Sequence, residues 1–534
     1  MSEIRRREFL IGSLTAAAAA PLAGMADVKS RVGLVQSTHK RLAKPLSADH
    51  PLDYETVRDM VWRAIEYGQP RAGSLEAKIK AGSWVVIKPN IVYLKPQTGY
   101  RPGDITDLRV TRAVLEYVAQ KSKAGRITVA EGGTYRAFND PLKDNVVTQG
   151  GVHVNALTCD WGTEDFPGAG GTLGGMLKDL GAAYRDKKFD YVDLSYDVVR
   201  DASGNPRRIE PPRLNGVGAF GNRPDYFVTN TIRNCDFLIA VPVAKVHETC
   251  GITACFKSYV GTAPRCSYAT PGLFWNANLH DQHSVDVRID PFIADLAAFH
   301  PPDYNVVDGI RGLQLTEHNN RQPDQMVRNN LILAGEDTVA ADAVVARLLG
   351  FNAVDVDYLH MGAARGLGTF DMNRIEVVGD ELDRFARAWA KPRSWYARCN
   401  REWRVSRAPD SSLAAWKRFT SFGDTLYFEK ALGAGAPLAA AAATVRAGGS
   451  RKGFLWLGLS GKATVTLNGE KIMEEENTTR YRVGQFQKPV ELRAGENQLV
   501  FRVQEVGNKP VQLAAVLTGP GNNGDSLEGA RWTA

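Results

Sequence analysis

The sequence predicts an α/β protein: a mainly parallel sheet with helices on both faces, followed by a β-sandwich of jelly-roll type. Apolar strand-like runs alternate with amphipathic helix-like segments over residues 30–384. The pattern changes to short strands separated by Gly- and Asn-containing turns over residues 426–534. At 534 residues the chain exceeds what one hydrophobic core usually holds, which favours separate domains. Residues 385–425, rich in Arg and Trp, are predicted to form a helical linker between them.

Residues 1–26 have the pattern of a twin-arginine signal peptide. Arg5, Arg6 and Arg7 precede an alanine-rich apolar run that extends to about Gly24. The run is roughly half of the ~20 residues that a membrane span needs, which disfavours a transmembrane anchor. We therefore expect a periplasmic or secreted protein that meets the membrane only through the export machinery. Such signals carry folded cargo, often with a cofactor already inserted, which favours a bound cofactor.

The charge and the cysteines exclude several classes of function. The net charge is +7, but no dense Lys/Arg block lies outside the signal, so we expect no nucleic-acid partner. The six cysteines form no C-x-x-C pair, which indicates neither a ferredoxin-type cluster nor a zinc ribbon. In an oxidising compartment Cys250, Cys255 and Cys266 are candidates for disulfide formation.

The elements of the α/β part follow in order along the chain. Strands are predicted at 32–35, 84–87, 127–130, 237–243, 304–307 and 330–334, and helices at 54–67, 108–119 and 340–349. A Gly- and Asp-rich stretch, 140–225, interrupts the alternation and is predicted to be an insertion over the crevice.

The C-terminal part has a hairpin signal, since Asn468 and Gly469 lie between two β-rich runs and favour a type I′ turn. Its strands resemble those of the accessory jelly-roll domains of glycoside-processing enzymes. That resemblance implies sugar binding on aromatic platforms, although a purely structural role is equally compatible. Each candidate platform residue also fits a core position; the candidates are Trp456, Tyr481, Phe486 and Trp532.

Polar residues follow four of the predicted strands, where an α/β sheet binds its ligands. The longest apolar strand stops in Lys245 and His247, whose side chains point to one side if the chain stays extended. The other strands end in Lys88 with Asn90, in Glu131 and in Asp308. A single polar residue at a strand end is also compatible with simple exposure to solvent. Four such strand ends together predict a crevice site.

Further candidates lie downstream of that strand. Thr253 and Lys257 share one face if their segment is helical, and a lysine there could hold an anion or link covalently to a carbonyl group. His280 and His283 are candidate ligands of a transition metal. The predicted catalytic residues are His247, Lys257 and Lys245; the predicted cofactor-binding residues are Lys88, Asn90, Thr253 and Asp308; the predicted metal ligands are His280 and His283.

These residues belong to an ordered series that resembles the domain-of-unknown-function 362 family. The series consists of Val86–Asn90, Val241–His247, Gly251–Lys257, Gly261, His280, Val307–Gly309 and Leu333–Asp342. The resemblance covers roughly residues 30–380 and implies the fold and the position of the site more than a reaction. Members of the family often carry an added iron–sulfur domain, for which this chain lacks the cysteines.

The order of His247, Lys257 and His280 is also similar to the nickel-pincer lactate racemase superfamily. There a lysine tethers a pyridinium-derived cofactor and a histidine helps to hold nickel. The resemblance implies Lys257 as the tether, His280 as a nickel ligand and His247 as a support for proton or hydride transfer. The glycine pair that precedes the lysine in that superfamily is replaced here by Ala254, Cys255 and Phe256.

Together these patterns predict a crevice site, assisted by a metal or a nickel-pincer-type cofactor, that acts on a small polar substrate such as a sugar or hydroxy acid. An isomerase or oxidoreductase is favoured over a hydrolase, because the sequence contains neither H-E-x-x-H nor G-x-S-x-G. Two alternatives stay open. The protein could bind carbohydrate in the periplasm without catalysis, or it could be a maturation factor that delivers a cofactor to a partner enzyme.

Overall fold

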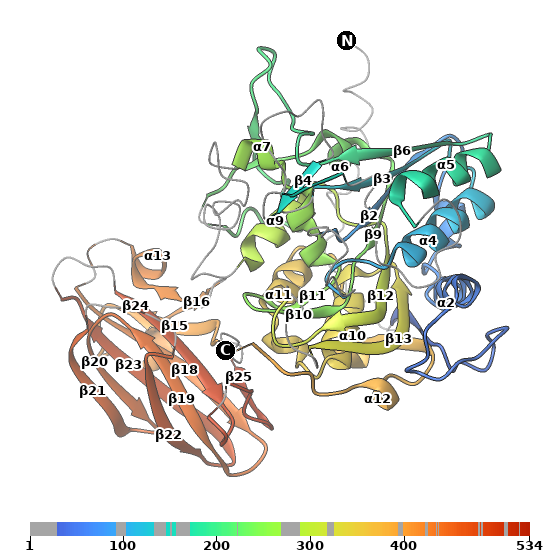
Figure 1. The fold of residues 1–534 in the computed structure, drawn as a ribbon. Coiled ribbons are helices and arrows are strands. Elements are labelled where there is room, and N and C mark those ends of the chain that lie inside the picture. The colour runs from blue at the N-terminus through green and yellow to red at the C-terminus, as the bar shows by residue number, and fades with distance from the viewer. Residues whose placement is uncertain are drawn as a thin grey trace.

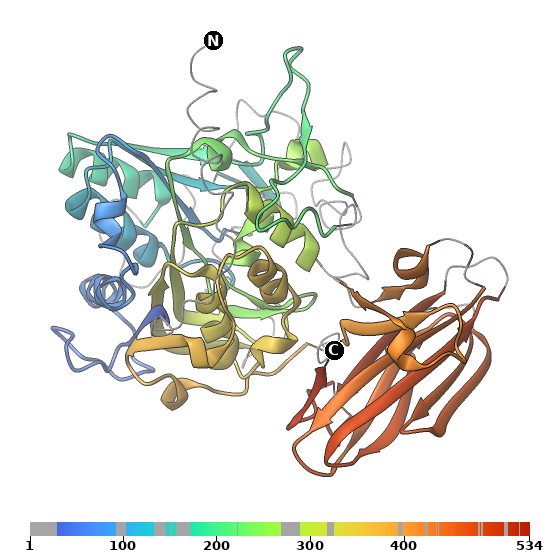
Figure 2. The same cartoon turned by 180° about the vertical axis from the view of Figure 1, so that it is seen from behind.

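The computed structural model describes residues 29–91, 103–132, 146–149, 152–155, 171–221, 223–268, 289–317, 325–392, 399–421, 425–433, 435, 437–478, 481, 484–506, 511–522 and 524–533. These residues form an α/β domain and a β-sandwich, and the sandwich lies to one side of the α/β domain (Figures 1 and 2). The predicted signal peptide, 1–26, and the predicted metal ligands His280 and His283 lie outside the described residues.

The α/β domain is built on an eight-stranded sheet. In spatial order its strands are β14 (Ile375–Gly379), β1 (Ser30–Gln36), β13 (Met326–Gly335), β12 (Tyr304–Leu313), β9 (Phe237–Val241), β2 (Trp84–Pro89), β3 (Arg126–Glu131) and β6 (Lys188–Asp193). Only β13 runs antiparallel to its neighbours; the other neighbouring pairs are parallel. The mainly parallel sheet that the sequence predicts is confirmed.

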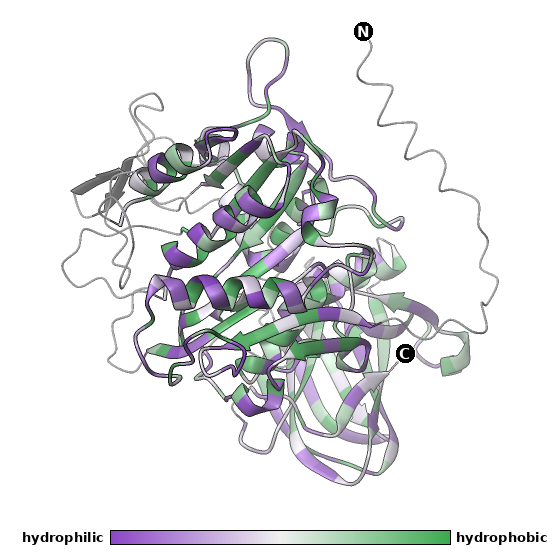
Figure 3. Ribbon diagram, turned by 90° about the vertical axis from the view of Figure 1, so that its right-hand side faces the viewer, coloured by the Kyte–Doolittle hydropathy of each residue, from purple (hydrophilic) through white to green (hydrophobic). Residues whose placement is uncertain are grey.

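Helices cover both faces of this sheet, as predicted. One face packs against α2 (Tyr54–Tyr67), α4 (Leu108–Lys121) and α5 (Leu173–Ala183). The other packs against η1 (Phe256–Thr262), α9 (Asp290–Phe299), α10 (Thr338–Leu348) and α11 (Asp357–Ala364). The strands are largely apolar, whereas helices such as α2 alternate apolar and polar residues (Figure 3). Each apolar helix stripe is thereby buried on the sheet.

Side chains fix where several helices begin. Asp53 accepts a hydrogen bond from the Thr56 amide at the start of α2, and Asp337 does the same for Ala340 at the start of α10. The shorter elements of the domain are α3 (Leu75–Lys78), β4 (Val146–Gln149), β5 (Val152–Asn155), β7 (Arg208–Ile209), β8 (Tyr226–Phe227), α6 (Asn230–Asn234), β10 (Lys245–His247), β11 (Gly251–Thr253), α7 (Arg265–Tyr268), η2 (Ala353–Asp355), η3 (Met372–Arg374) and α12 (Leu382–Phe385).

The strand order reverses between β2 and β9. From β2 the chain proceeds through β3 to β6 at one edge, and then returns to the other side of β2 with β9, β12 and β13. In open α/β sheets, ligands bind outside the carboxyl ends of the strands at such a reversal. The topology therefore directs attention to the residues that follow Pro89 and Val241.

The sandwich consists of two antiparallel sheets with a common apolar core. One sheet contains β16 (Lys417–Thr420), β15 (Glu402–Ser406), β18 (Leu438–Ala447), β23 (Gly495–Gln504), β20 (Gly461–Leu467), β21 (Glu470–Thr478) and β25 (Ala530–Thr533). The other contains β17 (Leu426–Tyr427), β24 (Gln512–Thr518), β19 (Arg451–Leu459) and β22 (Phe486–Leu492), and the short helices are η4 (Leu413–Ala415) and α13 (Phe428–Leu432). Asn468 and Gly469 have φ values of 52° and 89°, as the predicted type I′ turn between β20 and β21 requires.

Two expectations differ from the structure. The segment 385–425, expected to be a helical linker, contains β15 and β16, because Trp403 and Val405 alternate with polar residues and face the sandwich core. The stretch 140–225, expected to be an insertion, contributes α5 and the edge strand β6 to the α/β domain itself. An edge strand tolerates the polar residues that concealed β6 in the sequence.

The cysteine and membrane expectations have simple outcomes. Cys250, Cys255 and Cys266, the candidates for disulfides, form no disulfide among the described residues, and neither do Cys235 and Cys399. Within the described part of the chain, every helix is too short or too polar to cross a bilayer.

Candidate functional site

Lys245 and His247 lie beyond the carboxyl end of β9, on the short strand β10. β10 pairs with β11, so the chain stays extended there and the two side chains point to one side, as the sequence predicts. Both are buried, and both contact Glu317. The Lys245 Nζ donates to the carbonyl oxygens of Glu317 at 2.7 Å and of Asp104 at 2.8 Å.

The charge states of this pair follow from their surroundings. Burial lowers the pKa of Lys245 to about 8, although Asp104 and Glu317 oppose the shift. The Nδ1 of His247 accepts the amide proton of Thr249 at 3.1 Å, which leaves Nε2 as the protonated nitrogen of the neutral ring. That Nε2 lies 3.5 Å from the Glu317 Oε1. In this tautomer Nε2 donates toward Glu317, and Nδ1 is the ring nitrogen that could accept a further proton if the Thr249 amide released it.

A second buried cluster lies at the ends of β2 and β3. Lys88 forms an ion pair with Glu131, and its Nζ also donates to the Ser258 Oγ at 3.2 Å. Glu131 accepts further hydrogen bonds from the amides of Ile91 at 3.3 Å and Gly132 at 2.9 Å. Burial lowers the pKa of Lys88 and raises the pKa of Glu131, while their attraction opposes both shifts.

Gly261, in η1, lets this cluster form. A Cβ at this position would lie 1.9 Å from the Glu131 Oε1 and 2.8 Å from the Lys88 Nζ. Its carbonyl oxygen accepts the Gly132 amide at 3.0 Å, so two glycine backbones meet directly beside the ion pair. The absence of a side chain is therefore a requirement of this close approach.

A third group of buried charges surrounds Asp308, which lies in β12. Asp308 accepts hydrogen bonds from the amides of Asp107 at 2.7 Å and Ile310 at 2.9 Å. Burial, together with the neighbouring charge of Asp107, raises the pKa of Asp308. The pKa of Asp107 is lowered despite burial, because Arg109 and Arg311 form ion pairs with it.

Asn90 fixes the loop that lies between these clusters. Its amide donates to the Thr106 Oγ1 at 2.9 Å, and the Thr106 hydroxyl donates to the carbonyl oxygen of Val241 at 2.6 Å. The Asn90 Nδ2 lies 3.4 Å from the same Asp104 carbonyl that Lys245 contacts. Asn90 thus positions the site backbone and is buried itself.

Lys257 lies among these clusters and differs from the other two lysines. It is partly exposed, and its amine has no hydrogen bond or ion pair with any residue that the structure describes. Burial is the largest cause of the lowered pKa of Lys257. Lys88 lowers it further, whereas Glu317 and Glu131 oppose the shift, which places the amine within the electric field of both clusters.

Two predicted residues are arranged differently from the expectation. Thr253 does not share a helical face with Lys257, because it ends β11 and pairs across to Lys245, whereas Lys257 is in η1. The positive φ of Gly251, 83°, starts that short strand and breaks the expected helix. The Thr253 hydroxyl is buried and has no hydrogen-bond partner among the described residues. His280 and His283 fall outside those residues, and within them no group of three metal-binding side chains occurs.

The structure therefore brings together seven of the nine predicted site residues at the carboxyl edge of the sheet. Sequence reasoning missed Glu317, which carries no local signal, and Ser258. It also gave no role to Asp342, whose carboxylate accepts the amides of Cys255 at 2.7 Å and Phe256 at 3.1 Å, directly before Lys257. Asp342 ends the family-like series in the sequence, so that signal was available.

The comparisons with known proteins agree with part of this picture. Residues 196–347 match the family described as "Domain of unknown function (DUF362)", which confirms the resemblance over the segment that contains Lys245, His247, Lys257 and Asp308. A search of the curated proteins finds no match.

Three solved structures illustrate the likeness of the two domains. The lactate racemase apoprotein from Thermoanaerobacterium thermosaccharolyticum is 13% identical, with 52% of each chain covered and a TM-score of 0.28; the chain thus spans about half of that protein. A family 35 carbohydrate binding module from an environmental isolate is 17% identical, covering 18% of this chain and 71% of that one, with a TM-score of 0.14. The β-glucosidase from Kluyveromyces marxianus, in complex with glucose, is 10% identical, covering 22% of this chain and 15% of that one, with a TM-score of 0.18.

Proposed function

We propose that this is an exported, periplasmic or secreted protein that binds a small anionic polar substrate, a hydroxy acid or an acidic sugar, at the carboxyl ends of β2, β9 and β12. The reaction is an isomerisation or an oxidoreduction that a metal or cofactor assists. The observation that carries the proposal is Lys257: the residue is only partly buried, its amine lacks a partner among the described residues, and burial of that amine lowers its pKa. A lysine of this kind is a nucleophile or an anion-binding group rather than a structural ion pair.

The balance of charge supports an anionic substrate. Glu131 neutralises Lys88, and Lys245 contacts only uncharged carbonyl oxygens in the bonds that the structure describes. Among the described residues, neither the Lys245 nor the Lys257 amine forms an ion pair with a carboxylate, although the charges of Asp104, Glu317 and Glu131 act on them from farther away. A carboxylate or phosphate of the substrate would complete the site.

His247 supplies the group that moves a proton. Its Nδ1 is fixed by the Thr249 amide, so Nε2 is oriented toward Glu317. Protonation of the ring at Nδ1, with release of the Thr249 amide, would give an ion pair between Nε2–H and that carboxylate, and loss of the Nδ1 proton would restore the neutral ring and its hydrogen bond. The histidine is thus suited to exchange a proton at a carbon next to a carboxylate or hydroxyl group.

The residues also fit a cofactor that is held covalently. The Lys257 amine is free to form an amide- or imine-type bond, and a pyridinium-derived group there would supply a hydride acceptor. Lys88 and Thr253 lie in the same region, and the Thr253 hydroxyl is a buried group with unused hydrogen-bonding capacity. The proposed metal ligands His280 and His283 are outside the described residues, so the metal is part of the proposal only through their residue type.

The test is a comparison of Lys257→Ala and Lys257→Arg with the wild type, all isolated from the native export route. Turnover is followed as deuterium incorporation at carbon and as interconversion of enantiomers, with lactate, malate and glucuronate as probes. Peptide mass spectrometry reports any adduct on Lys257, and elemental analysis reports metal. The control variant is Lys178→Ala, an exposed lysine on α5.

Each outcome has a defined meaning. Loss of turnover in both variants, with probe binding kept in Lys257→Arg, supports a covalent or proton-transfer role, because arginine keeps the charge but not the nucleophile. Full turnover in Lys257→Ala would refute the proposal. The wild type isolated from the native export route keeps any metal or adduct that it acquired there. If this protein binds a probe but does not turn it over, the result would favour the alternative of a non-catalytic binding protein.

A further inference from the structure

Among the described residues, three polar contacts between the sandwich and the α/β domain bear on this region. Arg401, just before β15, forms a buried ion pair with Asp357, the first residue of α11. The Ser526 hydroxyl donates to Asp355, which precedes Asp357 by two residues. The third contact joins the Lys391 Nζ to Asp525 at 2.6 Å and is partly exposed. The first two contacts therefore meet at one place, the turn that begins α11.

Arg401 is fixed firmly to the sandwich. Its carbonyl oxygen accepts the Ser421 amide at 2.9 Å, and the preceding Asn400 amide donates to Ala515 of β24 at 2.8 Å. The guanidinium thus projects from a rigid sheet edge into the other domain. The side chains of Arg401 and Asp357 are each only 4% exposed.

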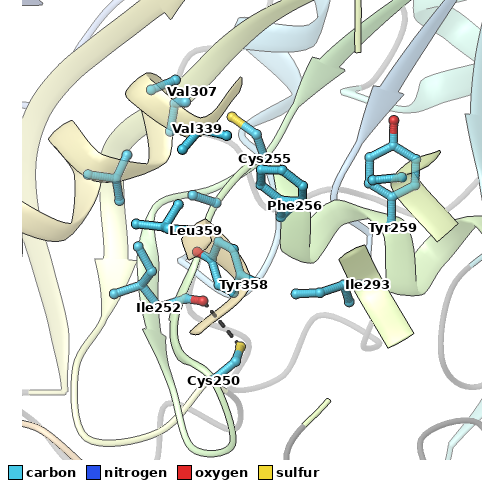
Figure 4. Packing of buried hydrophobic residues seen from close by; sticks show 14 of the residues in the cluster. Cys250, Ile252, Cys255, Phe256, Tyr259, Ile293, Val307, Val339, Tyr358 and Leu359 are labelled. Atoms are coloured by element: carbon cyan, nitrogen blue, oxygen red, sulfur yellow. Dashed lines mark hydrogen bonds between the residues drawn. The ribbon is translucent and has the colours of Figure 1, made fainter. Parts of the chain in front are cut away.

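α11 in turn packs against the residue before Lys257. The rings of Tyr358 and Phe256 are 5.4 Å apart, and Figure 4 shows Tyr358 beside both Phe256 and Ile252. A Cβ on Gly362 would lie 2.6 Å from the Phe256 Cζ. α11 and Phe256 are therefore in close contact over a full turn of the helix, with no room for independent movement.

The opposite side of Phe256 is held by the Asp342 carboxylate, through the amides of Cys255 and Phe256. Lys257 follows directly, and its amine lies in the fields of Lys88, Glu131 and Glu317, with the Cys250 thiol also close. A shift of α11 would move one wall of this arrangement while Asp342 held the other. Because Lys257 directly follows Phe256 in η1, a displacement of Phe256 would also displace the lysine.

We propose that Arg401 is a positioning residue for the α/β site: the sandwich, through the Arg401–Asp357 ion pair, holds α11 against Phe256 and thereby fixes the Lys257 amine. The inference deepens the proposed function, since it rests on Lys257 as the working amine. Removal of the guanidinium leaves a carboxylate buried without its counter-ion, and the start of α11 must then move toward water. The sandwich is thus a structural part of the active domain and not an independent appendage.

The experiment measures the pH profile of Lys257 labelling. Full-length wild type, Arg401→Met and Asp357→Asn are reductively methylated with formaldehyde and cyanoborohydride from pH 6 to 11, and the Lys257 peptide is quantified by mass spectrometry. Exposed Lys178 serves as the internal reference in every sample. We expect the midpoint for Lys257 to rise by about one pH unit in both variants, toward the ordinary value for lysine, because the amine gains water.

The matched control is Lys391→Met, which removes the interdomain ion pair that does not reach α11 and should leave the midpoint unchanged. Arg401→Lys should restore most of the wild-type profile. Asp357→Asn keeps the size of the side chain, so it remains informative if Arg401→Met does not fold. A wild-type midpoint in the Arg401 and Asp357 variants overturns the positioning role alone. An ordinary midpoint in the wild type would overturn the proposed function and this inference together.

Discussion

Gly261→Ala tests whether the site depends on the close approach of two backbones. The new Cβ would lie 1.9 Å from the Glu131 Oε1, where side-chain carbons essentially never come within 3.0 Å. The carboxylate must therefore retreat by at least about 1 Å to reach that limit, and by about 1.5 Å to reach ordinary van der Waals contact. It is the end of a flexible side chain, but Lys88, the Ile91 amide and the Gly132 amide all hold it in place.

The expected cost combines overpacking with a weakened buried ion pair. Overpacking of an interior costs about 1–3 kcal/mol, and removing one partner of a buried pair costs about 3–5 kcal/mol. Because the ion pair is distorted and not removed, we expect Gly261→Ala to lower the free energy of local opening of β2 and β3 by about 3 kcal/mol. Native-state hydrogen exchange of the β2 and β3 peptides measures this quantity without assuming that the two domains unfold together.

Two comparisons make the result decisive. Gly181→Ala, in α5, meets nothing within 4 Å and should be neutral or stabilise by up to about 1 kcal/mol. In a Glu131→Ala background, Gly261→Ala should cost less than about 1 kcal/mol, because the 1.9 Å clash is gone and the Lys88 amine, which would lie 2.8 Å away, is no longer held by the ion pair and can move. The reasoning is refuted if Gly261→Ala changes the opening free energy by less than about 0.5 kcal/mol, or if its cost is the same in both backgrounds.

Four further predictions concern single residues. Burial raises the pKa of Asp342 to about 6, so its contribution to stability is full below pH ~4 and is lost as the pH rises through 6; Asp342→Asn should flatten urea stability over that window. The pKa of Lys245, lowered to about 8, should make the wild type gain stability from pH 8 to ~10.4, a gain that is absent from Lys245→Met. Arg365→Met leaves the fully buried Asp295 without its counter-ion and should lower the unfolding free energy by about 3–5 kcal/mol in denaturant titrations. Trp456→Ala should destabilise the sandwich by about 3–5 kcal/mol and lower its melting temperature, because the indole is 7% exposed and donates to Asn522 at 2.6 Å. We expect a smaller effect on glucan affinity, measured by calorimetry.

The fold was predictable where the side-chain pattern reports burial directly. The fully buried strand Phe237–Val241 has a continuous apolar run. Asn468 and Gly469 both tolerate the positive φ values that a type I′ turn requires. Prediction failed where the pattern was mixed. Trp403 and Val405 do alternate with charged neighbours, but this alternation is short, and the Arg and Trp content of the whole segment favours a helix.

The site was predictable as a location and less so as a set of contacts. Strand ends identify Lys88, Lys245 and Asp308, because topology alone brings the ends of parallel strands together. Glu317 could not be found, since it reaches His247 from a segment 70 residues away and follows no pattern of its own. The helical pairing of Thr253 with Lys257 failed because a glycine with positive φ replaced the helix by a strand.

The first turn of α4 has a consequence for how the protein responds to its environment. That helix begins at the carboxyl edge of the sheet, where backbone amides commonly hold anions at any pH. Here the Asp107 side chain already occupies its first turn, by accepting the Arg109 amide at 3.0 Å. Attraction for an anion then depends on side-chain amines, and the Lys245 amine begins to lose its proton near pH 8. If the ligand is anionic as proposed, we expect alkaline conditions to release it and acidic conditions to retain it.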